Sequence, residues 1–168
     1  IPYGNRPNGL YIPRFRNVNG DDADVNFTRG YGYQGASLRL DWKMLGKMPG
    51  IGKSFKERMV KPGPWGIGFG GFGEALPHVD NRMMLNPDQR DRFGMPQVSF
   101  NYDWTDNEKK MRADMAVQAE NMLKAAGALF TFSMNEMSVP GLGIHEMGTA
   151  RMGHSPQDSV LNKWNQVH

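Results

Sequence analysis

Apolar and polar residues alternate along several short stretches of this chain, a pattern typical of strands with one buried face. The first stretch covers residues 9–15, where Pro13 indicates an edge strand or the end of a strand. Residues 30–40 repeat the alternation, with Tyr31 and Tyr33 among the apolar positions. Further predicted strands are a glycine-dense apolar run at 65–75 and shorter segments at 82–85, 97–102 and 128–134. Turn residues at 87–88 and 93–96 are expected to reverse the chain.

One long helix is predicted over residues 105–126. Thr105 and Glu108 match a capping box, in which two side chains satisfy backbone N–H groups of the first turn. Gly127 stands where a left-handed C-terminal cap belongs. Apolar residues recur at helical spacing and are expected to pack in the core: Met111, Met115, Ala119, Met122 and Leu123. A second, short helix is predicted around residues 52–59, inside a loop.

These elements predict an α+β fold with a largely antiparallel sheet and helices on one face. The length of 168 residues fits about one domain with a substantial core. The chain begins without methionine and stops within what reads as a structured segment, so we expect both ends to be cuts.

Composition excludes several classes of function. The net charge is only +3, and Lys and Arg are mixed with Asp and Glu, so nucleic acid is not an expected partner. The densest basic run lies at residues 53–61 and is interrupted by Glu57. A solvated surface segment is the favoured interpretation, and a phosphate-binding segment is the alternative. Cysteine is absent, which rules out disulfides, thiolate metal ligands and a cysteine nucleophile in this chain. No membrane span or signal peptide is visible, so the chain is expected to be soluble, in the cytoplasm or the periplasm.

Three motifs for catalysis or cofactor binding are weak. Gly66-x-Gly68-x-x-Gly71 matches a dinucleotide fingerprint, but Pro77 fits badly in the helix that should follow, and a bent, glycine-rich strand is the favoured interpretation. The four histidines lack the short spacings of zinc sites. The serines lack the Gly-x-Ser-x-Gly turn that exposes a hydrolase nucleophile.

The strongest candidate is His145, within the glycine-punctuated segment 143–153. A lone histidine in a loop is more often structural than catalytic. Here the glycines allow backbone to approach a ligand, while Thr149 and Arg151 offer hydrogen-bond donors. Imidazole is able to take a proton from an alcohol at neutral pH, which suits oxidation by hydride abstraction.

Two groups of residues resemble one family. Residues 145–153, His-Glu-Met-Gly-Thr-Ala-Arg-Met-Gly, are similar to the H-x-x-G-T-x-R-M-G segment of the glucose-methanol-choline (GMC) oxidoreductases, flavoproteins that oxidise sugars and alcohols. Residues 74–77, 81–82 and 91–96 resemble the family's E-x-x-P, N-R and D-x-x-G-x-P succession, in the same order. Together they anchor residues 65–168, and the first 60 residues are attached by position alone.

The resemblance implies that His145 lies beside the flavin and takes the proton of the substrate hydroxyl as hydride leaves for FAD. Gly148, Thr149 and Arg151 would lie close to the cofactor, whereas Asn81, Arg82 and Glu74 are interpreted as structural. The implied substrate is a sugar, glycoside or polyol, oxidised at a CH–OH group to a carbonyl. Oxygen, a quinone or a cytochrome partner would then accept electrons.

The resemblance also implies a domain organisation. Residues 1–142 would form the substrate-binding domain, with an antiparallel sheet of about six strands and the helix at 105–126. Residues 143–168 would form the histidine loop and the start of the return to a flavin domain. The family's dinucleotide fingerprint and its second catalytic His or Asn have no match here.

We therefore expect this chain to be the substrate-binding part of a larger FAD-dependent enzyme. Its main partner would be the missing FAD-binding domain of the same parent, and the isolated piece should bind FAD poorly and be inactive. The alternative is a non-catalytic carbohydrate-binding or interaction module that keeps the same fold.

Overall fold

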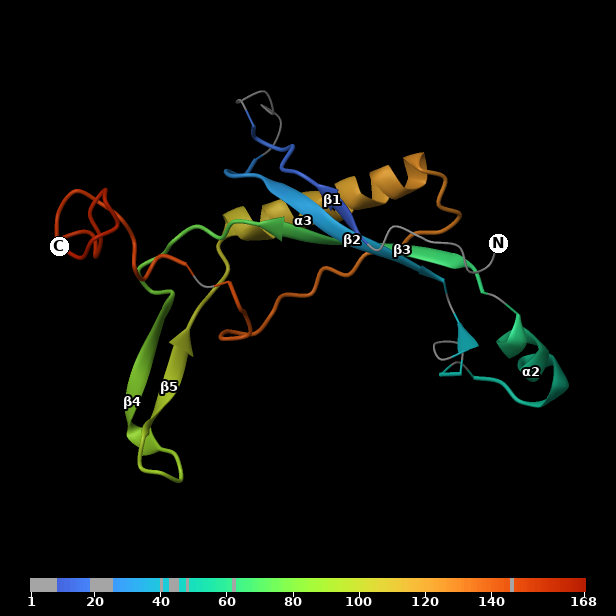
Figure 1. The fold of residues 1–168 in the computed structure, drawn as a ribbon, viewed down its shortest axis with the longest axis horizontal. Coiled ribbons are helices and arrows are strands. Elements are labelled where there is room, and N and C mark those ends of the chain that lie inside the picture. The colour runs from blue at the N-terminus through green and yellow to red at the C-terminus, as the bar shows by residue number, and fades with distance from the viewer. Residues whose placement is uncertain are drawn as a thin grey trace. The chain divides into compact units, whose positions relative to one another are not determined.

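The computed structural model describes residues 9–18, 26–39, 41–42, 46–47, 49–61, 63–145 and 147–168. Their elements follow in the order β1 (Leu10–Ile12), β2 (Tyr31–Arg39), α2 (Gly52–Val60), β3 (Trp65–Gly73), β4 (Arg82–Arg90), β5 (Pro96–Asn101) and α3 (Asp106–Ala125), as Figure 1 shows. The chain divides into two compact units, the first formed by residues 1–74 and 106–135, the second by residues 75–105 and 136–168. An α+β class with antiparallel sheets is confirmed.

The first unit is built on a three-stranded antiparallel sheet in the order β1-β2-β3. β2 and β3 pair along their whole length, from Tyr31 opposite Gly73 to Arg39 opposite Trp65. The glycine-rich run is therefore a strand, and the element that follows it is β4 and not a helix. This confirms the structural interpretation of the run and removes the local unit that a dinucleotide fingerprint requires.

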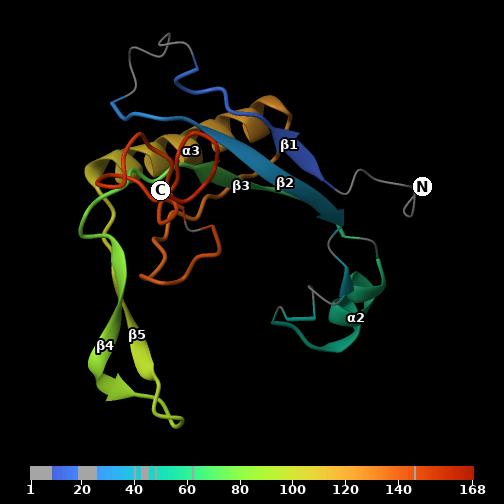
Figure 2. The same ribbon diagram turned by 60° about the vertical axis from the view of Figure 1, so that its left-hand side comes forward.

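Helix α3 lies along this sheet, as both ribbon views show (Figures 1 and 2), and contacts β3. Gly73 permits the close approach, because a Cβ atom there would stand 2.5 Å from the sulfur of Met111. The core consists of Phe27, Tyr31, Tyr33 and Met111, with Ile12, Phe15, Phe69, Met115, Ala119 and Met122 packed against it. The methionine stripe is thus core packing, as its spacing predicts. The helix ends before Gly127, whose φ of 89° confirms the predicted left-handed cap.

The carboxylate of Asp114 on α3 joins the helix to Tyr31 of β2 and to Arg16, which precedes β2. Arg16 donates two hydrogen bonds of 2.9 Å to the two oxygens of Asp114, and the Tyr31 hydroxyl donates a further one. Beside it, the Tyr33 hydroxyl donates to the carbonyl of Met115 at 2.7 Å. Burial would raise the pKa of Asp114, but the bonds from Arg16 and Tyr31 outweigh it and lower this pKa. Burial, together with the bond to Asp114, raises the pKa of Tyr31.

The second unit contains the two-stranded hairpin β4-β5. Its turn follows Asp91, whose side chain accepts hydrogen bonds from the N–H groups of Phe93 (2.8 Å) and Met95 (2.9 Å). The turn predicted at residues 87–88 is wrong, because β4 continues through them with a register shift between Asn86 and Arg90. At the other end, Asn81 bonds both the N–H and the carbonyl of Asp103, which supports its structural interpretation.

Two predictions about the sheet need correction. The strand expected at residues 128–134 is wrong: this segment is irregular, and most of its large apolar side chains are exposed. No described strand pairs with it to supply the backbone partners that a strand needs. The described residues also form separate sheets of three and two strands, and not a single sheet of about six.

We expect Asp114→Asn to lower the free energy of unfolding by about 2 kcal/mol at pH 7, because it weakens charge-assisted bonds in a part-buried site. The pKa of Asp114 is lowered in the folded state, so its contribution is present above the unfolded pKa and is lost as the pH falls. The difference between wild type and variant should therefore close below about pH 4. Urea titrations at a series of pH values measure it.

Lys110→Ala, an exposed change on the same helix, is the control and should leave stability nearly unchanged. A stability difference for Asp114→Asn that stays constant down to strongly acidic pH would contradict the assigned electrostatic role.

Candidate functional site

His145 lies in an exposed, irregular segment of the second unit. A turn closed by a 3.1 Å bond from the N–H of Leu142 to the carbonyl of Val139 precedes it. Within the described part of the chain, its imidazole has no hydrogen-bond or ion-pair partner. Among the described residues, no side chain or backbone group therefore competes with a ligand for this ring.

Residues 148–150 form a turn, and the space beside Gly148 is open. Gly148 has a φ of 101°, a conformation that side-chain-bearing residues rarely adopt, and nothing lies within 4 Å of the position that a Cβ would take. Thr149 follows in the same turn and is exposed. The backbone at Gly148 and the side chain of Thr149 are therefore both accessible.

Arg151 is held more firmly than its neighbours. Its carbonyl accepts bonds of 3.1 Å from the N–H groups of Val160 and Leu161, and its Nε donates to the carbonyl of Asp158 at 2.6 Å. Next along the chain, Met152 forms an isolated bridge with Leu161. Arg151 thus lies where the loop of residues 154–161 folds back against residues 151–153.

A close approach at Gly153 closes this loop. Its N–H donates to the carbonyl of Leu161 at 2.8 Å, and a Cβ on Gly153 would stand 2.6 Å from the Cβ of Ser159. Ser159 is buried, and its hydroxyl donates to the carbonyl of Ser155 at 2.7 Å. Any side chain at position 153 would force the two arms of the loop apart.

Ser159 and His168 form a pair that is structural in this arrangement. The hydroxyl of Ser159 has one hydrogen, and the carbonyl of Ser155 receives it. Nε2 of His168 lies 2.8 Å from the hydroxyl oxygen of Ser159, and it must then donate a hydrogen bond to that oxygen. Because its lone pair is not directed at the serine proton, His168 does not activate Ser159 as a nucleophile.

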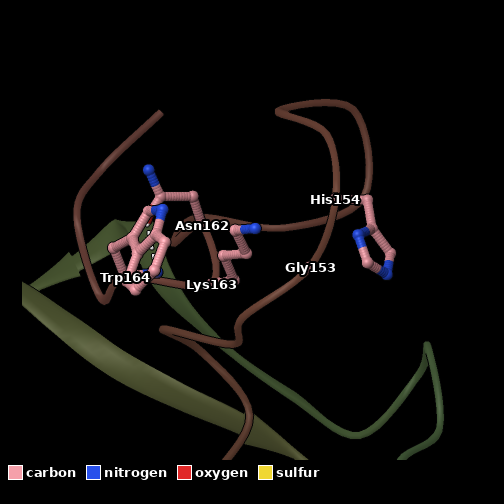
Figure 3. Close-up of a pocket in the computed structure, with 5 residues that line it drawn as sticks. All are labelled: Gly153, His154, Asn162, Lys163 and Trp164. Carbon is pink, nitrogen blue, oxygen red and sulfur yellow. Dashed lines mark hydrogen bonds between the residues drawn. The ribbon is translucent and has the colours of Figure 1, made fainter.

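A shallow pocket of about 320 Å³ opens beside this loop, lined by Gly153, His154, Asn162, Lys163 and Trp164 (Figure 3). The Asn162 side chain fixes the turn by accepting bonds from the N–H groups of Trp164 (2.8 Å) and Gln166 (3.2 Å). The Lys163 ammonium lies 5.0 Å from the centre of the Trp164 ring. His145 does not line this pocket.

The structure brings only part of the predicted site together. Arg151 and Gly153 share one hydrogen-bonded loop, but within the described part of the chain no hydrogen bond joins His145 to Thr149 or Arg151. The pocket at residues 162–164 was missed by the sequence interpretation. An Asn that precedes three polar or aromatic residues is a turn signal, and it could have located this turn without indicating a ligand.

In the described ranges, no cluster of three or more His, Asp or Glu side chains is arranged to hold a metal ion. The same ranges contain no helix with the length and apolar character needed to cross a membrane.

Comparison with known proteins identifies the family. A family model described as GMC oxidoreductase matches residues 77–168, more than half of the chain. The chain therefore belongs to the GMC oxidoreductases, and its relatives are oxidoreductases by name.

Two relatives align over most of the chain. A 2-methyl-1,2-propanediol dehydrogenase of Mycolicibacterium austroafricanum is 33% identical over 87% of this chain and 27% of its own length. The fructose dehydrogenase large subunit of Gluconobacter japonicus is 30% identical over 83% of this chain and 25% of its own length. A pyranose 2-oxidase of Lyophyllum shimeji is 31% identical over 54% of this chain and 15% of its own length. The chain thus spans about a quarter of the first two relatives.

The exposed turn suits contact with the flavin ring more than binding of the whole FAD molecule. The turn at Gly148 leaves backbone accessible, and Thr149 and Arg151 are donors suited to flavin carbonyl oxygens. The glycine run that could have met the pyrophosphate is instead paired as β3. The residues present therefore fit one edge of a flavin ring, and no phosphate-binding turn is formed by the glycine run.

We expect Gly153→Ala to open the loop that carries Arg151, because the added methyl would overlap Ser159. The amide protons of Gly153 and Leu161, both bonded across the loop, should exchange with solvent at least about tenfold faster, which corresponds to about 1.4 kcal/mol of local stability. Hydrogen exchange measured by NMR tests this.

Gly68→Ala is the matched control, since nothing lies within 4 Å of the Cβ position there. Unchanged exchange at Leu161 in Gly153→Ala would show that the loop is not closed in the way described.

Proposed function

We propose that this chain is the substrate-binding part of an FAD-dependent enzyme that oxidises a CH–OH group of a sugar, glycoside or polyol to a carbonyl. Its membership of the GMC oxidoreductases carries the proposal. The relatives that align over most of the chain are named for a diol and a sugar, which supports this substrate class. Their names also favour a dehydrogenase, whose electrons pass to an acceptor such as a quinone or a cytochrome partner.

His145 is proposed as the base that takes the hydroxyl proton. FAD, when bound, supplies the acceptor for the hydride that leaves the same carbon, so that the alcohol loses one proton and one hydride in total. The exposed imidazole without a competing partner among the described residues supports this assignment. A base must reach the proton that it abstracts, and an uncommitted side chain on a glycine-flanked segment meets that requirement.

Gly148, Thr149 and Arg151 are proposed to lie against the flavin. Gly148 would let the backbone approach the ring face, and Thr149 would donate a hydrogen bond from the same turn. The Nε bond to Asp158 orients Arg151 and leaves its terminal NH₂ groups as further donors. These residues would position the cofactor edge while the rest of its site comes from the FAD-binding domain of the parent.

In the full-length protein, His145→Ala should lower the turnover of a sugar or polyol substrate by a factor on the order of 100 to 10,000, as loss of a general base commonly does. Turnover is to be expressed per bound flavin, with the flavin content of each variant measured from its absorbance. Imidazole added to the medium should restore part of the lost rate.

His78→Ala is the matched control, because His78 is an exposed histidine in the same unit, beside Asp80. It should retain wild-type turnover. If His145→Ala lost its flavin but kept normal turnover per bound flavin, His145 would hold the cofactor and would not be the base.

A further inference from the structure

The net positive charge of this chain falls in one short segment. Residues 47–61, termed the basic segment, contain five cations and one carboxylate: Lys47, Lys53, Lys56, Arg58, Lys61 and Glu57. Their net charge is therefore +4, whereas the whole chain carries +3, so all remaining residues together sum to −1. Outside this segment, cations and carboxylates are mixed in nearly equal number, and the surplus of positive charge is local to it.

All five cations of the basic segment are exposed, and helix α2 has no buried residue. The Lys53 side chain is 90% exposed, and its ammonium lies 3.8 Å from the carboxylate of Glu57. Such an exposed pair is weak and leaves most of the local positive potential in place. The segment thus presents a cationic surface to its surroundings.

Helix α2 has two different faces. Phe55 and Met59 are half-buried and face the preceding loop, where a Cβ on Gly46 would lie 3.3 Å from the Met59 methyl group and a Cβ on Gly50 would meet the Phe55 ring. Lys53, Lys56 and Val60 follow at helical spacing and share another face. Gly46 and Gly50 thus lie against the side of the helix that carries Phe55 and Met59, and the cationic face is the other one.

Two large aliphatic side chains accompany these cations in the open. Ile51, immediately before the helix, is 91% exposed, and Val60, its last residue, is 82% exposed. Each therefore stands in solvent next to lysine residues. Side chains of this kind lose unfavourable contact with water when they enter the boundary between lipid headgroups and acyl chains.

We propose that the basic segment binds the surface of an anionic phospholipid membrane. Its lysines would contact lipid phosphates, and Ile51 and Val60 would insert between headgroups. Four of the five cations are lysine, a residue depleted in protein–protein interfaces, where arginine is favoured. Lysine suits a diffuse anionic surface, because its point charge requires no matching fork of acceptors. In this mode the segment lies on the membrane surface and does not span the bilayer.

The test uses the full-length protein and sedimentation with two kinds of vesicle, phosphatidylcholine alone and equal parts of phosphatidylcholine and phosphatidylglycerol. Wild type should bind the anionic vesicles at low salt, release at high salt and ignore the neutral ones. K53Q/K56Q should weaken this binding by about 30-fold, the factor expected for two lysines near an anionic surface. K109Q/K110Q, which removes two exposed lysines from α3, is the control and should bind as wild type does.

A further variant, I51S/V60S, separates a membrane from a soluble acidic partner. It should weaken vesicle binding severalfold and leave binding to polyglutamate unchanged. The proposal is overturned if wild type fails to sediment with anionic vesicles, or if K109Q/K110Q loses as much affinity as K53Q/K56Q. Equal effects of I51S/V60S on vesicles and polyglutamate would assign the segment to an acidic protein instead.

Discussion

The arrangement of the first unit depends on one carboxylate of α3, that of Asp114. It accepts hydrogen bonds from Arg16 and from the Tyr31 hydroxyl, and these bonds join the helix to the sheet. The helix and the sheet also share apolar contacts, but methionine side chains are flexible and by themselves would allow several alignments. Charge-assisted bonds are directional and fix one of them. The Tyr33 bond to the helix backbone adds a second fixed point two residues further along β2. Register and core packing in this unit are therefore set together.

Local chemistry explains which elements were predictable. The capped, methionine-striped helix and the paired run at 65–73 follow from spacing alone, because their signals lie within the element. The segment at 128–134 has the same apolar composition as a strand, but a strand also needs a neighbour, and sequence composition does not specify one. The β4 strand that continues through Pro87 is a similar case, since the pairing with β5 overrides the local turn signal.

The candidate site shows the same limit. The motif at residues 145–153 could be found in the sequence because it combines unusual residues at fixed spacing. The turn at Asn162 and the contact of Gly153 with Ser159 form only when the loop folds back on itself. No short sequence pattern predicts this folding. The described residues place Arg151 in a bonded loop and leave His145 exposed, an arrangement consistent with a site that another part of the parent completes. The relatives, about four times longer than the aligned stretch, have room for that part.

We propose above that the full-length protein oxidises a CH–OH group by transferring hydride to flavin. The most direct test of this proposal is anaerobic mixing of the full-length protein with sugars and polyols, in ordinary form and with deuterium on the carbinol carbon, while the absorbance of oxidised flavin is followed. At least one such substrate should bleach the flavin, and the rate of bleaching should be severalfold lower with the deuterated form. Flavin that stays oxidised with every sugar and polyol, or bleaching without an isotope effect in single-turnover conditions, would contradict it.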